Sequence, residues 1–300
     1  MSNFKAWIGA FRLRTLPLAV AGIILGSLLA KSNDSFNLNI TLFAILTAIL
    51  LQILSNLAND YGDFSKGTDN DERVGPERAL QSGKISKSQM KSALILFSIL
   101  SLISGIILLW LSFGTHKLGY AMLFLLIGLS AIWAAIKYTV GKSAYGYQGL
   151  GDVFVFLFFG WVSVIGVYFL QVQSIDLPVF LPASALGILS AGVLNLNNTR
   201  DIVNDKNSGK YTLAVKLGYQ NARKYQMVLF LLTLFTSLWY TLAFGTGMWQ
   251  QLFWISVLPL SIVVIKTYKA QEPKELDPLL KIQALSTLLY AITFGLGQIL

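Results

Sequence analysis

The sequence predicts an all-α integral membrane protein with nine transmembrane helices. Only 12% of its 300 residues are charged, whereas 55% are hydrophobic, and its mean hydropathy is +0.63. A soluble domain carries about 25% charged residues, so this chain lacks the charge to keep a folded surface in water. Such high hydrophobicity also excludes intrinsic disorder. Because the chain has no cysteine and one histidine, disulfides, thiolate sites and multi-histidine metal sites are excluded.

Apolar runs long enough to cross a bilayer recur along the whole chain. About 20 apolar residues are needed to cross about 30 Å of hydrocarbon. The predicted spans cover residues 16–30, 38–58, 92–113, 118–136, 152–171, 177–196, 225–245, 249–266 and 279–300. No small-residue cleavage site follows the first run, so we expect it to be a retained helix rather than a signal peptide. We expect residues 1–300 to form a single domain.

The basic residues predict how these helices are oriented. With the N-terminus in the cytoplasm, 21 of the 23 Lys and Arg residues lie in inner segments, and only Lys31 and Lys117 lie in outer ones. Cytoplasmic loops of membrane proteins are enriched in basic residues. We therefore expect a multi-pass protein of the cell inner membrane with a cytoplasmic N-terminus and an outer C-terminus. This asymmetry also explains the net charge of +9 without a nucleic-acid partner.

A first acidic cluster lies at the inner end of the second predicted span. Asn59 and Asp63 are four residues apart and share a helix face, and Asp60 lies beside them. Asp69 follows in a glycine-containing loop. Three further acidic residues of this loop are expected to be ordinary solvated charges: Asp71, Glu72 and Glu77.

A second acidic cluster lies at the inner end of the sixth predicted span. Asp201 and Asp205 are again four residues apart. Asn198 precedes them, Arg200 adjoins Asp201, and Lys210 follows. One such cluster is most simply a polar loop. Two clusters on the same side, each at a helix end and each with the same spacing, favour a functional site.

The chemistry of these residues predicts a magnesium–diphosphate site at the cytoplasmic interface. Carboxylates close to a membrane interior are costly and usually functional. Like charges four residues apart on a helix repel one another, so a cation is needed between them. Oxygen ligands suit Mg²⁺, which retains water molecules and commonly bridges carboxylates to substrate phosphates. Neighbouring Lys and Arg side chains would bind the remaining phosphate oxygens.

Five sequence motifs carry a resemblance to a known family. They are RLRTLPLAVAGIILG, NLANDYGDFSKGTD, GPERALQSGKIS, YTVGKSAYGYQGLGDVFVFLFFG and NNTRDIVNDKNSGKYTLAVKLG, and they run in order from residue 12 to residue 218. In these residues the chain resembles the UbiA superfamily of intramembrane aromatic prenyltransferases. The resemblance implies nine transmembrane helices around a central cavity, with Asp-rich loops at its cytoplasmic mouth.

The motifs NDYGD, GYQGLGD and NNTRD most resemble the naphthoate-prenylating branch of that superfamily. This resemblance implies transfer of a polyprenyl chain from a polyprenyl diphosphate to 1,4-dihydroxy-2-naphthoate, with loss of carbon dioxide, to give demethylmenaquinone. Mg²⁺ is the implied cofactor. Two alternatives remain: a related prenyltransferase that uses another acceptor, such as 4-hydroxybenzoate or homogentisate, and an ion-coupled transporter. Acidic clusters at the inner edge rather than the bilayer midplane disfavour the transporter.

The resemblance also assigns roles to individual residues. The implied catalytic residues are Asp60, Asp63, Asp201 and Asp205, and the implied metal ligands are Asn59, Asp63, Asp69, Asp201 and Asp205. Gly67 occupies the last position of the family's NDxxDxxxD motif, so the fourth ligand is expected to be Asp69 or water. The diphosphate is expected to contact Asn198, Arg200, Lys210, and Arg78 or Lys84. The residues expected near the acceptor are Arg12, Arg14, Lys137, Lys142, Tyr138, Tyr145, Tyr147 and Asp152.

Overall fold

The computed structural model describes residues 2–69, 74–75, 78–245 and 247–300. The acidic loop residues Asp71, Glu72 and Glu77 therefore lie outside the described residues. Across the described ranges the regular secondary structure is entirely helical. Nine helices in these ranges are long and apolar enough to cross a membrane, which confirms the predicted fold class.

The membrane-spanning helices follow one another along the chain. They are α2 (Leu16–Lys31), α3 (Leu38–Ser65), α4 (Lys87–Phe113), α5 (Leu118–Lys137), a fifth span of α6 (Gly151–Val155), η3 (Phe156–Ile165) and α7 (Gly166–Val172), then α8 (Phe180–Arg200), α11 (Tyr219–Phe244), α12 (Trp254–Lys269) and α13 (Asp277–Gly297). The shorter elements are α1 (Ser2–Phe11), η1 (Leu13–Thr15), η2 (Tyr145–Gln148), η4 (Leu177–Val179), α9 (Ile202–Asn207), α10 (Leu213–Leu217), η5 (Met248–Phe253) and η6 (Pro273–Leu276).

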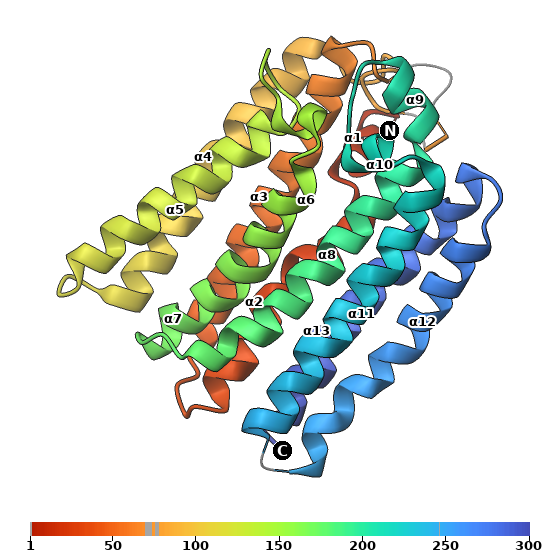
Figure 1. Ribbon diagram of the computed structural model, residues 1–300. Coiled ribbons are helices and arrows are strands. Elements are labelled where there is room, and N and C mark those ends of the chain that lie inside the picture. Colours follow the sequence, from red (N-terminus) through yellow and green to blue (C-terminus); the bar gives the residue numbers. More distant parts are fainter. Residues whose placement is uncertain (1, 70–73, 76–77, 246) are drawn as a thin grey trace.

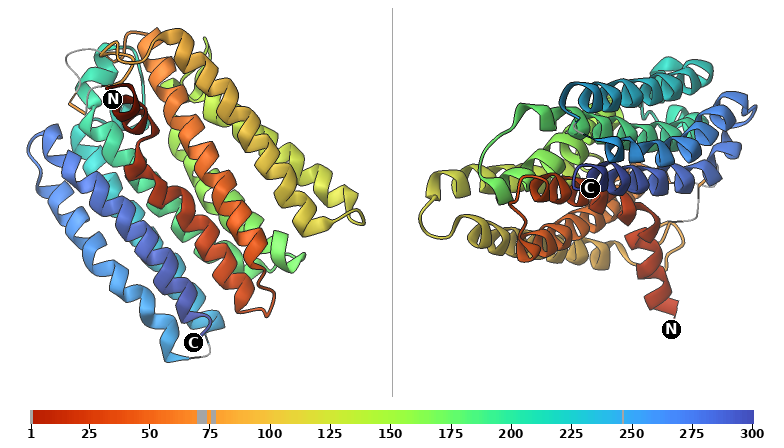
Figure 2. Two further views of the ribbon diagram at one scale, coloured as in Figure 1. Left: turned by 180° about the vertical axis from the view of Figure 1, so that it is seen from behind. Right: turned by 90° about the horizontal axis from the view of Figure 1, so that it is seen from below.

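The long helices lie alongside one another in a tilted bundle, with the two chain termini at opposite ends (Figure 1). Helices α9 and α10 lie at the same end as the N-terminus. Helix α1 projects from the side of the bundle when it is seen from below (Figure 2). The two acidic clusters therefore belong to one end of the molecule.

The main apolar core lies where α2, α7, α8 and α13 meet. Leu25, Tyr168, Leu186, Tyr290 and Phe294 are all buried there. Burial of each such side chain contributes about 1.5–3 kcal/mol in water, although in lipid close packing rather than the hydrophobic effect holds helices together. Helices α4 and α5 are much less buried and form one edge of the bundle (Figure 1).

Several helices extend beyond the predicted apolar runs, and two of them, α3 and α8, carry the acidic clusters. Helix α3 continues to Ser65 and α8 to Arg200, whereas apolar patterning alone ends these spans at residues 58 and 196. Once a helix is nucleated, each further residue adds a hydrogen bond at little cost, so polar residues continue it. This extension places Asn59, Asp60 and Asp63 on the last turns of α3.

The fifth span contains a π-helical segment, η3, that the sequence did not predict. Gly160 of η3 packs so closely on α8 that a Cβ atom there would lie 2.7 Å from the Ala183 carbonyl oxygen. π-helical turns are rare and occur frequently at functional sites. Here the segment forms part of the wall of the cavity described below.

Candidate active site

Three loops meet at the N-terminal end of the bundle and bring the two acidic clusters together. Asn204 Nδ2 donates a hydrogen bond to the Thr68 carbonyl oxygen at 2.9 Å. The backbone N–H of Tyr211 donates to the carbonyl oxygen of Tyr147 at 3.1 Å. These bonds tie the loop after α3 and the loop before α6 to the loop between α8 and α11. Residues about 140 positions apart thereby share one site.

Asp63 and Asp205 face each other across a shared lysine. Lys210 Nζ lies 3.6 Å from Asp63 Oδ2 and 3.5 Å from Asp205 Oδ1, and all three residues are buried. Burial raises the pKa of Asp205 to about 6, with the Asp201 and Asp63 charges adding to it and Lys210 opposing it. Burial lowers the pKa of Lys210, but the Asp63 and Asp205 carboxylates outweigh this and raise it. Lys210 is therefore charged.

Tyr147 holds Asp63 in place. Its hydroxyl donates to Asp63 Oδ1 at 2.8 Å and lies 2.6 Å from Thr68 Oγ1. Burial raises the pKa of Tyr147, so the phenol keeps the proton that it donates. Lys66 Nζ lies 3.6 Å from the centroid of the Tyr147 ring. The sequence predicted that Tyr147 contacts the acceptor, whereas the structure places its hydroxyl on the carboxylate of Asp63.

Asp60 belongs to a separate ion-pair cluster. Its Oδ1 atom pairs with Arg12 and lies 3.5 Å from Arg78 Nε. Arg78 Nε also lies 3.9 Å from Asp69 Oδ1. Asp60 is buried, and two guanidinium groups compensate its charge. The structure thus directs Asp60, predicted as catalytic, away from the pair formed by Asp63 and Asp205.

Arg200 is fully engaged with protein side chains. Its Nε and Nη2 atoms donate to the two carboxylate oxygens of Asp201 at 2.9 and 2.6 Å. Its Nη1 donates to Asp277 at 2.6 Å and Nη2 also donates to Asn197 at 3.1 Å. Arg200 was predicted to contact the diphosphate, but here it orients Asp201 and ties α8 to the start of α13. Sequence reasoning missed Asp277, because no motif links it to Arg200.

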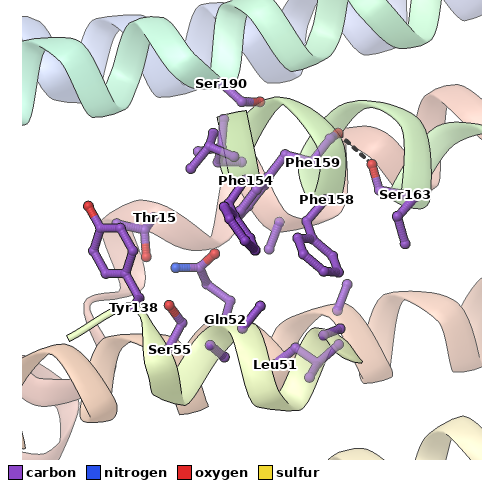
Figure 3. Close-up of a pocket in the computed structure, with 18 of the residues that line it drawn as sticks. Thr15, Leu51, Gln52, Ser55, Tyr138, Phe154, Phe158, Phe159, Ser163 and Ser190 are labelled. Carbon is purple, nitrogen blue, oxygen red and sulfur yellow. Dashed lines mark hydrogen bonds between the residues drawn. The ribbon is translucent and has the colours of Figure 1, made fainter. Parts of the chain in front are cut away.

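A cavity of about 710 Å³ opens between these acidic residues and continues into the bundle. Most of the predicted site residues line it: Asn59, Asp63, Asp69, Arg78, Tyr138, Asn198, Asp201, Asp205 and Lys210. Arg12, Arg14 and Tyr145 line it as well. Deeper in the bundle the rings of Phe154 and Phe158 face Leu51, Gln52 and Ser55 of α3 (Figure 3). The cavity thus joins a charged mouth to an apolar interior.

The other predicted residues do not converge on this cavity. Lys84, Lys137 and Lys142 are exposed and do not belong to the lining that the described residues form. Asp152 is buried at the start of α6, where Tyr225 of α11 hydrogen-bonds it. Sequence reasoning also missed Gln52 as a lining residue, although a polar side chain inside an apolar run was the available signal.

The donor set at the mouth suits a hard divalent cation. Among the described residues, no group of three or more acidic or histidine side chains is close enough to hold an ion alone. However, Asp205 Oδ2 and Asn204 Oδ1 are buried without a hydrogen-bond partner in the described part of the chain. Such buried acceptors are costly unless a cation or donor satisfies them. Together with Asp63, they fit an ion that keeps water and phosphate ligands.

Comparison with known proteins identifies the family. The model of the UbiA prenyltransferase family matches residues 19–287. The chain belongs to this family. It is 42% identical to the 1,4-dihydroxy-2-naphthoate octaprenyltransferase of Escherichia coli K12 over 297 residues, which is 99% of this chain and 96% of that protein. It is also 42% identical to the Haemophilus influenzae protein of the same name, over 99% of this chain and 97% of that protein.

Solved structures of UbiA homologues share the fold. The apo structure from Aeropyrum pernix K1 has a TM-score of 0.71 and 15% identity, and the match covers 95% of this chain and 97% of that chain. The structure from Archaeoglobus fulgidus bound to DMAPP and Mg²⁺ has a TM-score of 0.59 and 18% identity, with 96% and 98% covered. At these identities the likeness extends to the architecture of the bundle.

Proposed function

We propose that this UbiA-family protein transfers a polyprenyl chain from a polyprenyl diphosphate to 1,4-dihydroxy-2-naphthoate, with loss of carbon dioxide. The observation that carries the proposal is the pairing of Asp63 and Asp205 at the mouth of one apolar cavity. The proposed acceptor is the one that the Escherichia coli and Haemophilus influenzae relatives are named for.

The charged mouth binds the diphosphate in this proposal. The residues that would hold Mg²⁺ are Asn59, Asp63, Asp201, Asn204 and Asp205, which all line the cavity. When bound, Mg²⁺ would neutralise the charge that grows on the diphosphate as the carbon–oxygen bond breaks. Lys210 and Arg78 lie at the same mouth and would bind the remaining phosphate oxygens as charge-assisted donors.

The deeper cavity protects the reactive intermediate. Breaking the bond from the allylic carbon to oxygen sends the electron pair to the diphosphate and leaves an allylic cation. The apolar walls exclude water from this cation, and the faces of Phe154 and Phe158 stabilise its charge. The ring carbon of the acceptor that bears the carboxylate attacks the cation. The carboxylate then leaves as carbon dioxide, its bonding electrons return to the ring, and the product is the quinol form of demethylmenaquinone.

The proposed location is the inner membrane, with the cavity mouth toward the cytoplasm. The basis is the concentration of Lys and Arg in alternate loops, together with the acidic clusters on that same side. Fusions of a reporter that is active only in the cytoplasm are expected to be active after Gly83 and inactive after Thr115. The opposite pattern would reverse the assigned orientation.

The test of function is an assay with purified protein, 1,4-dihydroxy-2-naphthoate and a long-chain polyprenyl diphosphate. We expect prenylated product, carbon dioxide and diphosphate in equal amounts, all abolished by EDTA and restored by Mg²⁺. Asp63→Ala and Asp205→Ala are each expected to abolish turnover while the protein still accumulates in membranes. Product from 4-hydroxybenzoate or homogentisate, but not from the naphthoate, would refute the proposed acceptor.

A further inference from the structure

A chain of hydrogen bonds crosses from α1 into the cavity and ends at Gln52. Asn56 Nδ2 donates to the Phe11 carbonyl oxygen at 2.9 Å and to Thr15 Oγ1 at 3.0 Å. Gln52 Nε2 donates to Asn56 Oδ1 at 3.1 Å. Gln52 is 9% exposed, and its Oε1 has no hydrogen-bond partner among the residues that the structure describes.

The direction of these bonds is fixed by chemistry. A backbone carbonyl oxygen can only accept a hydrogen bond, so Asn56 must present its amide nitrogen to Phe11 and its oxygen to Gln52. Gln52 must then present its own nitrogen to Asn56. Its oxygen is consequently turned away from Asn56, and Figure 3 shows it directed toward the ring of Phe154. A ligand at this point therefore has to donate a hydrogen bond, and a carboxylate or a phosphate oxygen is excluded as the partner.

The surroundings of Gln52 favour an aromatic ligand. Its carboxamide reaches into the pocket opposite the rings of Phe154 and Phe158 (Figure 3). The ring of Phe154 stacks on Tyr145 with a centroid distance of 3.9 Å, so this part of the wall is aromatic. An aromatic ring between this wall and α3 would gain stacking contact and bring a hydroxyl to Gln52 Oε1.

The depth of Gln52 matches the position of an acceptor. Gln52 lies seven residues before Asn59 on α3, which is about 10 Å along the helix axis. A prenyl diphosphate bound at Asp63 and Asp205 directs its prenyl chain into the cavity. Its first carbon then lies between the charged mouth and the level of Gln52, so a ring held by Gln52 is adjacent to the carbon that it attacks.

We infer that Gln52 Oε1 accepts a hydrogen bond from the 4-hydroxyl of the naphthoate acceptor and so helps to select this acceptor. The inference rests on the proposed function. The 1-hydroxyl adjoins the carboxylate and hydrogen-bonds it internally, so the 4-hydroxyl is the donor left for the protein. A site built to bind a substrate hydroxyl discriminates strongly against an analogue without it, because the buried protein group is then left unpaired.

The test compares wild type, Gln52→Met and Gln283→Met in lipid-reconstituted full-length protein. Gln283 is the matched control, because it is buried, its Oε1 has no partner among the described residues, and it is outside the cavity lining that those residues form. We expect Gln52→Met to raise the KM for 1,4-dihydroxy-2-naphthoate about tenfold, the equivalent of about 1.4 kcal/mol for one hydrogen bond. The KM for the polyprenyl diphosphate should be unchanged, and Gln283→Met should leave both values unchanged.

A second readout uses 1-hydroxy-2-naphthoate, which lacks the 4-hydroxyl, as a competitive inhibitor. Wild type should bind it about tenfold more weakly than the dihydroxy compound, and Gln52→Met should lose that preference. Gln52→Asn, which withdraws the oxygen by one methylene, should lose part of the preference for the dihydroxy compound. This variant replaces Gln52→Met in the test if the Met variant does not fold. An unchanged preference in a folded Gln52 variant overturns the inference. A wild-type protein without naphthoate prenylation instead overturns the proposed function.

Discussion

Removing the hydroxyl of Tyr147 is expected to slow the cleavage of the prenyl diphosphate, while the aromatic ring stays in place at the site. In Tyr147→Phe, Asp63 Oδ1 loses the donor at 2.8 Å, whereas the ring keeps its contact with Lys66. A hydrogen bond to a charged group contributes about 1.5–3 kcal/mol. A loss of about 2 kcal/mol, if expressed in the transition state, lowers kcat/KM about 30-fold. The bond positions a residue of the diphosphate site, so the defect should appear with every acceptor.

The assay for Tyr147→Phe is steady-state kinetics with each substrate varied in turn. Tyr290→Phe is the control, because its hydroxyl bonds Ser237 at 2.8 Å and it is buried away from the site. We expect the control to retain wild-type kinetics. A Tyr147→Phe enzyme within twofold of wild type would refute the positioning role. A rise confined to the KM for the naphthoate would instead support direct contact with the acceptor.

Two further predictions concern the framework that holds the carboxylates. Gly62→Ala should destabilise the protein by about 1–3 kcal/mol and reduce activity, because a Cβ there would lie 2.5 Å from Thr139 Oγ1. The control Gly119→Ala, whose Cβ would meet nothing within 4 Å, should leave stability and activity unchanged. Equal melting temperatures of the two variants would contradict this prediction. Arg200→Met should cost about 3–5 kcal/mol, because it removes the two charge-assisted hydrogen bonds that Arg200 donates to buried Asp201. Lys274→Met removes an exposed ion pair of about 0–1 kcal/mol. Denaturation of Arg200→Met and Lys274→Met in the same detergent measures the difference in their free energies of unfolding. Equal losses of stability in these two variants would refute the importance of the Arg200 contacts.

The fold was predictable because its signals are local. Apolar runs of about 20 residues define membrane spans without reference to tertiary contacts, and the nine predicted spans correspond to nine helices among the described residues. The pairing of the two acidic clusters was also predictable in outline, since each has the same spacing at a helix end. The structure places Asp63 and Asp205 at one lysine, as a shared site requires.

The direction of each charged side chain was not predictable. Asp60 adjoins Asn59 in the sequence, yet its place on the helix turns it toward Arg12 and Arg78. Arg200 adjoins Asp201 and binds it, and its contact with Asp277 joins helices 77 residues apart in the chain. Gln52 lies in no motif, and the direction of its buried, unpartnered acceptor follows only from the bonds of Asn56. These are tertiary properties, which sequence spacing does not encode.

The most direct test of the central claim is a structure of the protein with a non-hydrolysable prenyl thiolodiphosphate and Mn²⁺, located by its anomalous scattering. The account predicts metal density between Asp63 and Asp205, a diphosphate against Lys210, and a prenyl chain that enters the cavity beside Phe154. Metal and diphosphate bound elsewhere, with Asp63 and Asp205 contacting neither, would contradict it.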